Sequence, residues 1–359
     1  MALLDKKYIH FIGIGGIGTS SLAQILHEKS KIISGSDCCP SEMTKSLKKN
    51  GIKIYPNHDK KNISEKHQLI IYSPAIPLNN PELIRAKELK IPCLSYPEAL
   101  GELTKNYYTI AIAGTHGKST TTAMTALVAI EAKLDPTVVI GTKLKEFKNR
   151  NYRVGKSKYL IIEACEYKRS FLNFHPEILI ITNIEADHLD YYKDLKDYKK
   201  AFYEIVEKIP KDGKIIINSD DKNSLEIVKN AKAEVIILNL DKTGNFQLKN
   251  QVLITPDKKI KIQPSIPGKF NLKNAANAAM VGLILNAPIR AIENAIKKYK
   301  GSGRRLEYKK TKMPKTKFID DYGHHPSEIR ATLSTAKLQN RPITAVFQPH
   351  RYSRTQALL

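Results

Sequence analysis

The chain has 359 residues, of which 42% are hydrophobic, and this length suffices for two or three domains with their own cores. Its formal net charge is +24, from 59 basic and 35 acidic residues. The basic side chains are scattered singly and in pairs, without a basic tail or an aromatic-interleaved patch. We therefore favour a charged, solvated surface over nucleic-acid binding. Part of the excess charge would also attract anionic substrates.

The four cysteines contain no C-x-x-C pair, and the adjacent Cys38 and Cys39 are poorly placed for disulfides or zinc. Free thiols are therefore expected at these two residues and at Cys93 and Cys165. The N-terminal residues carry charge just before a short apolar run of strand length, which is unlike a signal peptide. No run of about 18 apolar residues occurs, so no membrane span is predicted. We expect a cytoplasmic protein.

The first unit, residues 1–105, alternates strands with helices. Residues 8–29 read as strand, glycine turn and amphipathic helix. Further strands are expected at 31–37, 53–56, 69–76 and 91–95, with helices at 41–50 and 81–89. This alternation predicts a parallel, doubly wound sheet.

A glycine motif lies at the first turn of this unit. Gly13, Gly15 and Gly18 form G-x-G-x-x-G between the strand and the helix, and Asp37 ends the second strand. Such glycines allow a tight turn and a close backbone approach to a diphosphate at a helix N-terminus. The motif predicts a nucleotide or UDP-type diphosphate site. A packing turn without ligand and an NAD-dependent oxidoreductase are the alternatives.

The second unit, residues 106–303, opens with IAIAGTHGKSTTT at residues 110–122. A Gly-Lys-Ser at the start of a helix is typical of a phosphate-binding loop, although Ile112 stands where the general pattern has a glycine. The backbone N–H groups of the loop would hold phosphate. Lys118 would reach the β- and γ-phosphates, and the Ser119 hydroxyl would bind Mg²⁺. Further strands are expected at 158–165, 177–184, 213–220 and 233–240, with a hairpin within 245–264 and helices at 271–286 and 288–300.

Polar residues follow several of these strands. Glu163 is in the usual place for a Mg²⁺ contact behind a phosphate loop, whereas for Glu166 an ordinary surface acid is the stronger interpretation. Further candidates beyond strand ends are Asn183, Glu185, Asp187 and His188, then Arg304, Arg305, Asp320, Asp321, His324, His325, His350, Arg351 and Arg354. Because ligands bind at the carboxyl ends of parallel strands, we expect several of these residues to meet. Asn271 and Asn274, at a helix start, would contact adenine or cap the helix.

The third unit, residues 304–359, reads as a strand at 316–323, a helix at 326–338 and a strand at 342–349. One such βαβ unit cannot cover both faces of a sheet. We therefore expect either a partial C-terminal domain or a small appendage packed on the second unit.

Taken together, the motifs resemble the Mur ligases, ATP-dependent amino-acid ligases of peptidoglycan synthesis. The segments that carry the resemblance run in family order from residue 9 to residue 355: HFIGIGGIGTSSLA, SGSD, YSPAIP, AGTHGKSTTT, EACEYKRSFL, TNIEADHLDYY, GSGRRLE, DDYGHHPSE and FQPHRYSRT. The family uses the shortened loop G-T-x-G-K-[ST]-T, which is present here. The last two segments favour the member that adds L-alanine to UDP-N-acetylmuramate; a ligase that attaches a recycled tripeptide, or an inactive nucleotide-binding fragment, is the alternative.

The resemblance implies a three-domain α/β architecture. A Rossmann-like N-terminal domain (1–105) would hold the UDP-sugar, a central P-loop ATPase-like domain (106–303) would hold ATP and Mg²⁺, and a partial Rossmann-like C-terminal domain (304–359) would bring the amino acid. The family's third domain continues beyond residue 359. Phe270 stands where the family usually has a histidine.

The resemblance also implies roles for individual residues. The catalytic residues would be Lys118, His188, Arg305, Asp321 and His324. ATP would contact Gly114, Thr115, His116, Gly117, Lys118, Ser119, Thr120, Asn271 and Asn274. The UDP-sugar would contact Gly13, Gly15, Gly16, Gly18, Asp37, Ser73, His116, Arg351 and Arg354. Magnesium would be held by Ser119, Glu163 and His188.

Overall fold

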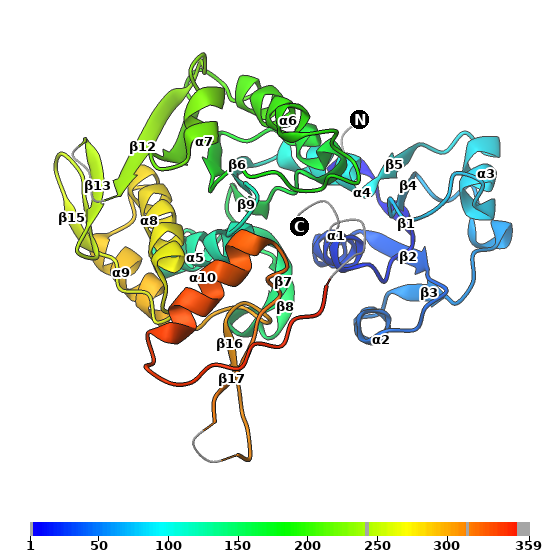
Figure 1. Ribbon diagram of the computed structural model, residues 1–359. Coiled ribbons are helices and arrows are strands. Elements are labelled where there is room, and N and C mark those ends of the chain that lie inside the picture. The colour runs from blue at the N-terminus through cyan, green and yellow to red at the C-terminus, as the bar shows by residue number, and fades with distance from the viewer. Residues whose placement is uncertain (1–2, 241–243, 314–315, 350–359) are drawn as a thin grey trace.

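The computed structural model describes residues 3–240, 244–313 and 316–349. Over these residues the chain forms three successive units, built on sheets of five, ten and two strands (Figure 1). The α/β class and the parallel sheets predicted from the sequence are confirmed.

The first unit is a parallel sheet in the order β3-β2-β1-β4-β5. Its elements are η1 (Leu3–Asp5), β1 (Tyr8–Ile12), α1 (Ile17–Glu28), β2 (Ile32–Ser36), α2 (Glu42–Lys49), β3 (Lys53–Tyr55), η2 (Lys60–Asn62), β4 (Leu69–Tyr72), α3 (Pro81–Glu88), β5 (Cys93–Ser95) and α4 (Tyr96–Thr104). Helices α1, α2 and α4 share one core with one face of the sheet, and α3 packs against the other face. This layering is Rossmann-like.

The second unit has a sheet in the order β15-β14-β13-β12-β11-β10-β6-β9-β7-β8. The strands from β13 to β7 are parallel, and β8, β14 and β15 join antiparallel at the edges. Its strands are β6 (Tyr108–Ala113), β7 (Thr137–Leu144), β8 (Arg150–Arg153), β9 (Tyr159–Glu163), β10 (Ile178–Ile181), β11 (Lys214–Asn218), β12 (Glu234–Leu240), β13 (Phe246–Lys249), β14 (Val252–Ile254) and β15 (Lys259–Lys261). Its helices are α5 (Lys118–Glu131), η3 (Lys145–Phe147), η4 (Tyr167–Asn173), α6 (Leu195–Glu207), α7 (Lys222–Ile227), α8 (Lys269–Ile284) and α9 (Ile289–Lys298).

The central strands of this sheet are nearly continuous apolar runs because both of their faces are covered. All four residues of β10 are buried. Helices α5, α8 and α9 share a core with one face, and α6 with the other. Strand β6 lies between β10 and β9, with all three parallel. The loops that follow these strands therefore meet at one edge of the sheet, where ligands bind in open α/β folds.

The third unit consists of the antiparallel pair β16 (Glu307–Lys309) and β17 (Phe318–Asp320), followed by α10 (Pro326–Lys337). Helix α10 packs on the second unit, where Ser327 hydrogen-bonds Glu185 (Figure 1). The strand predicted at 342–349 is wrong, since these residues are exposed and have no regular structure. No described strand pairs with them, and a strand without a partner leaves its backbone groups to water.

Two further expectations concern bonding and membranes. All four cysteines are free, as predicted. Within the described ranges, no helix has both the length and the apolar character that crossing a bilayer requires.

Candidate active site

A pocket opens at the edge of the central sheet where β6, β9 and β10 end. The residues that line it come from the phosphate loop, from the end of β9, from the ends of β10 and β11 and the loops after them, from the start of α8 and from the third unit. They include Thr115–Thr120, Glu163, Thr182, Asn183, Glu185, Phe270, Asn271, Lys273, Asn274, Arg305, Leu306, Asp321, Ser327, Glu328, Ala331 and Thr332. The pocket thus joins most of the residues predicted for ATP, magnesium and catalysis.

The phosphate loop depends on two glycines in conformations that other residues rarely adopt. Gly114 has φ 126° and Gly117 has φ 84°. A Cβ atom at Gly114 would lie 2.2 Å from Thr182 Oγ1, and one at Gly117 would lie 2.6 Å from Asn274 Oδ1. Gly117 directly precedes α5, so the N-terminal backbone N–H groups of this helix face the loop. The shortened loop therefore has the strand–loop–helix geometry that is typical of a phosphate site.

Side chains after β10 hold the loop in shape. The Asn183 side chain accepts from His116 N–H at 3.1 Å and donates to the His116 carbonyl at 2.9 Å. The Thr182 hydroxyl donates to the same carbonyl at 2.6 Å. The Thr115 hydroxyl is hydrogen-bonded to the backbone of Glu185. These bonds hold the loop in one conformation.

Lys118 is paired with a buried acid. Its Nζ lies 3.0 Å from Glu166 Oε1 and also donates to the carbonyls of Gly114 and Thr115. Burial opposes the charge on Lys118, but the neighbouring acids, Glu166 foremost, hold the pKa of Lys118 above its ordinary value. Burial likewise opposes ionisation of Glu166, yet Lys118 and then His188 hold its pKa below the ordinary value.

The interpretation of Glu166 as a surface acid is wrong. Its side chain is fully buried and contacts Lys118 of the phosphate loop. His188 Nε2 lies 3.5 Å from the same Oε1 atom, and ligand atoms of Glu166, Asp187 and His188 lie within 4.8 Å of one another. The sequence shows two acids, Glu163 and Glu166, after a predicted strand. The spacing of these acids alone does not reveal that the second one is buried.

Ser119 and Glu163 meet as predicted. The Ser119 hydroxyl donates to Glu163 Oε1 at 3.0 Å, and Gly141 N–H donates to Glu163 Oε2 at 2.7 Å. A hydroxyl and a carboxylate at the start of α5 are oxygen ligands of the kind that Mg²⁺ prefers. The residues fit one ion here, and the Glu166, Asp187 and His188 cluster fits another.

The two asparagines of α8 lie in the same pocket. Both are buried; Asn274 contacts the phosphate loop at Gly117, and Asn271 Nδ2 donates to the Pro267 carbonyl at 2.7 Å. Phe270 also lines the pocket. Its ring adds an apolar surface to the pocket.

The third unit adds charged groups to the pocket. Arg305 Nη1 lies 3.3 Å from Glu328 Oε1, and His324 N–H donates to Glu328 Oε2 at 3.1 Å. The Asp321 carboxylate accepts from the backbone N–H groups of Leu306 and Gly323. The Asp321 side chain thus fixes the loop that carries Arg305. Arg351 and Arg354, predicted to reach the sugar substrate, lie outside the described residues.

His116 connects the phosphate loop to the third unit. It lies between two carboxylates, 3.6 Å from Glu185 and 3.2 Å from Glu328. Burial would lower the pKa of His116, but the neighbouring carboxylates of Glu185 and Glu328 raise it to about 9. The neighbouring His116 imidazole lowers the pKa of Glu185 to about 2, and His116 also lowers the pKa of Glu328 against the effect of burial.

These pKa shifts predict how the stability difference between wild type and His116→Gln depends on pH. The histidine contribution is complete below its unfolded pKa of 6.5 and disappears as the pH rises through about 9. The contribution of the Glu185 carboxylate to stability is complete above its unfolded pKa of 4.5 and declines as the pH falls towards 2. The difference in melting temperature should therefore peak between 4.5 and 6.5. A pH-independent difference would contradict the pairing, and the exposed His175, changed to Gln, is the matched control.

The glycine motif of the first unit lies outside the lining of this pocket. Gly13 has φ 74° and lies beside Ser73. The Asp37 carboxylate accepts from Gly15 N–H at 2.8 Å and from Cys39 N–H at 2.9 Å. The Asp37 carboxylate therefore holds the glycine turn in shape.

Tyr96, which sequence reasoning missed, lies between the two sites. A Cβ at Gly18 would lie 2.6 Å from its ring. Burial, followed by Cys165 and Glu163, raises the pKa of Tyr96 well above its ordinary range, so the phenol stays protonated. The signal for it is weak, because a tyrosine at the start of a helix is usually a packing residue.

Comparisons with protein-family models match three stretches of the chain. The model described as "Mur ligase family, catalytic domain" matches residues 8–108, "Mur ligase middle domain" matches 112–282, and "Mur ligase, glutamate ligase domain" matches 304–359. A UDP-N-acetylmuramate–L-alanine ligase of Clostridium botulinum (strain Langeland) is 46% identical over 99% of this chain and 80% of its own length.

Two solved structures are similar over much of the chain. The UDP-N-acetylmuramate-alanine ligase MurC of Thermotoga maritima has 30% identity and a TM-score of 0.80, covering 98% of this chain and 83% of that one. The UDP-N-acetylmuramate:L-alanyl-gamma-D-glutamyl-meso-diaminopimelate ligase of Neisseria meningitides has 25% identity and a TM-score of 0.73, covering 82% of this chain and 98% of that one.

Proposed function

The chain belongs to the Mur ligase family, and we propose that it joins L-alanine to UDP-N-acetylmuramate while ATP is converted to ADP and phosphate. The observation that carries the choice of acceptor is the 46% identity to a UDP-N-acetylmuramate–L-alanine ligase over 99% of this chain. The product would be a precursor of peptidoglycan, and the reaction would take place in the cytoplasm, where ATP is available.

The chemistry proceeds through an acyl-phosphate. A carboxylate oxygen of the muramyl lactyl group attacks the γ-phosphorus of ATP, and the bond to the ADP oxygen breaks. The amine nitrogen of L-alanine then attacks the activated carbonyl carbon. The tetrahedral intermediate collapses to the amide, phosphate leaves, and the amine loses a proton. Activation is needed because oxide is a poor leaving group, whereas phosphate is a good one.

Phosphoryl transfer depends mainly on positioning and on neutralising charge. Lys118 would exchange its loop carbonyls for the β- and γ-phosphate oxygens, and its pairing with Glu166 supports a permanently charged ammonium. Ser119 and Glu163 would hold one Mg²⁺, and His188 would hold the second beside Glu166. When bound, Mg²⁺ would offset the negative charge that develops on the phosphate oxygens.

The other contacts follow from the same assignment. Asn271 and Asn274 would lie at the adenine, and the loops at Gly13 and Asp37 would hold the UDP group. Arg305 and His324 would approach the reacting groups when the third unit closes, with Asp321 fixing their loop. Closure would exclude water, which otherwise hydrolyses the acyl-phosphate. We propose that the three domains meet at residues 105/106 and 303/304.

The assay that tests the proposal uses purified chain with ATP, Mg²⁺ and UDP-N-acetylmuramate, and compares L-alanine with a tripeptide acceptor. We expect UDP-N-acetylmuramoyl-L-alanine by mass spectrometry, with equimolar phosphate release. Product formed only with the tripeptide would instead identify the activity named for the Neisseria structure. Binding of both nucleotides without product would indicate an inactive fragment.

A further inference from the structure

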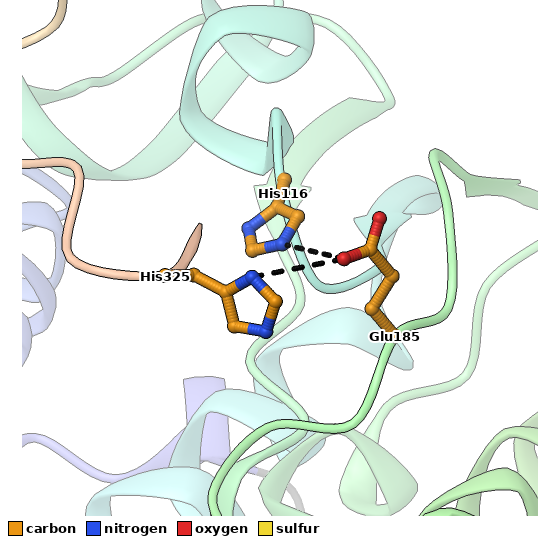
Figure 2. Close-up of side chains that lie close together, drawn as sticks. All are labelled: His116, Glu185 and His325. Carbon is orange, nitrogen blue, oxygen red and sulfur yellow. Dashed lines mark ion pairs between the residues drawn. The ribbon is translucent and has the colours of Figure 1, made fainter. Parts of the chain in front are cut away.

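We propose that His116, Glu185 and His325 form a binding site for a transition-metal ion of the zinc type, which would bridge the second and third units. The three residues come from the phosphate loop, the loop after β10 and the start of α10, and they converge in space (Figure 2). The site is distinct from the two Mg²⁺ positions proposed above, which involve Glu163 and His188.

The spacing of the donor atoms suits a metal better than hydrogen bonds. One ligand atom of each residue lies within 4.8 Å of the other two. His116 Nε2 and His325 Nδ1 each lie 3.6 Å from Glu185 Oε2 (Figure 2). This separation exceeds a hydrogen bond. It is close to the distance of about 3.4 Å between neighbouring ligands of a tetrahedral zinc ion whose bonds are about 2.1 Å long.

In both imidazoles, the ring nitrogen that faces away from Glu185 already has a polar partner. His116 Nδ1 lies 3.2 Å from Glu328 Oε1, and His325 Nε2 lies 3.2 Å from the Ala186 carbonyl. Histidines that bind metals typically donate their other ring N–H to a carboxylate or a carbonyl, which fixes the tautomer that presents a lone pair to the ion. The Ser327 hydroxyl, in turn, donates to Glu185 Oε2 at 2.5 Å.

The two ring nitrogens that face Glu185, His116 Nε2 and His325 Nδ1, would give up few hydrogen bonds when an ion binds. His116 Nε2 is buried and makes no hydrogen bond within the described residues. His325 Nδ1 accepts Ser327 N–H at 3.2 Å, a single bond that an ion would replace. Two imidazoles and one carboxylate suit Zn²⁺, Co²⁺ or Ni²⁺, whereas Mg²⁺ and Ca²⁺ favour all-oxygen sites. Three protein ligands leave a fourth position for water or a substrate oxygen.

Visible absorption of added Co²⁺ tests the site, with saturating Mg²⁺ present to fill the oxygen-ligand positions. Because protons compete with metal for imidazole, the titration is done at mildly alkaline pH. His325→Asn removes the imidazole and keeps a side chain that caps helices well. Glu185→Gln removes the charge and keeps an acceptor for Ser327. His324→Asn, next to the cluster but outside it, is the matched spectral control.

We expect wild type and His324→Asn to give the intense absorption of tetrahedral Co²⁺, and Zn²⁺ to abolish it. Binding should weaken by more than about tenfold in His325→Asn and in Glu185→Gln, since even outer-partner changes weaken metal binding by about 10- to 100-fold. No tetrahedral absorption in wild type, or unchanged absorption in both variants, would overturn the proposal.

A separate measurement tests whether the bound ion links the second and third units. Zn²⁺ should slow amide hydrogen exchange over α10, which carries no other proposed metal ligand, in wild type but not in His325→Asn. Both variants should retain the melting behaviour of a folded protein. Zn²⁺ binding that leaves exchange over α10 unchanged would mean that the ion does not link the two units, and the proposal would fail on that point.

Discussion

Lys118→Ala should lower the rate of ATP-dependent ligation by at least about 10³-fold, because it removes the ammonium that neutralises charge on the transferred phosphoryl group. UDP-N-acetylmuramate should bind nearly as well as in wild type, since the glycine motif of the first unit lies on a different sheet. Product formation and equilibrium binding of the UDP-sugar are the two measurements. Near-normal turnover would refute the assignment of the phosphate loop.

The structure adds a complication that this experiment must separate. Lys118 is the main counter-charge of the fully buried Glu166, and removing one partner of a buried ion pair destabilises a protein by about 3–5 kcal/mol. A loss of activity in Lys118→Ala alone therefore has two causes. The double variant Lys118→Met/Glu166→Gln replaces the pair by uncharged side chains of similar size. It should recover most of the melting temperature and none of the activity. Recovery of activity would show that Lys118 acts only through folding.

Glu163→Gln should reduce kcat by about 10²-fold and raise the Mg²⁺ concentration needed for half-maximal activity by at least about tenfold. The amide keeps one oxygen for either Ser119 Oγ or Gly141 N–H, so the geometry changes little while the charge is lost. The measurement is initial rate against Mg²⁺ concentration. Glu177→Gln is the matched control, because Glu177 lies at the opposite, amino end of β10. An unchanged Mg²⁺ dependence in Glu163→Gln would exclude Glu163 as a ligand.

The order of strands and helices was largely predictable because local patterns determine it. Apolar runs such as Ile178–Ile181 and the glycine turn before Lys118 mark parallel strands and a phosphate loop without tertiary information. Among the stretches for which the sequence predicts no element are those that form α4, α6, α7, β7, β8 and β16. The strand predicted at 342–349 is wrong because a strand also needs a neighbour, which a local pattern does not reveal.

The candidate site was predictable to the level of which loops meet, and not to the level of which charges pair. Ser119 and Glu163 lie together because adjacent parallel strands end at the same edge. The pairing of Lys118 with Glu166 depends on burial, and the position of His116 between Glu185 and Glu328 depends on how α10 docks. Both are tertiary facts, set by residues up to 212 positions apart in the chain.

The position of α10 also constrains the timing of each catalytic cycle. Ala331 and Thr332 of this helix line the same pocket as Asn271 and Lys118, so the helix forms part of its wall. ATP must enter, and ADP must leave, past a wall held by contacts such as that between Ser327 and Glu185. We therefore expect each turnover to include one undocking of the third unit. When chemistry is fast, the frequency of that undocking sets the upper limit of turnover.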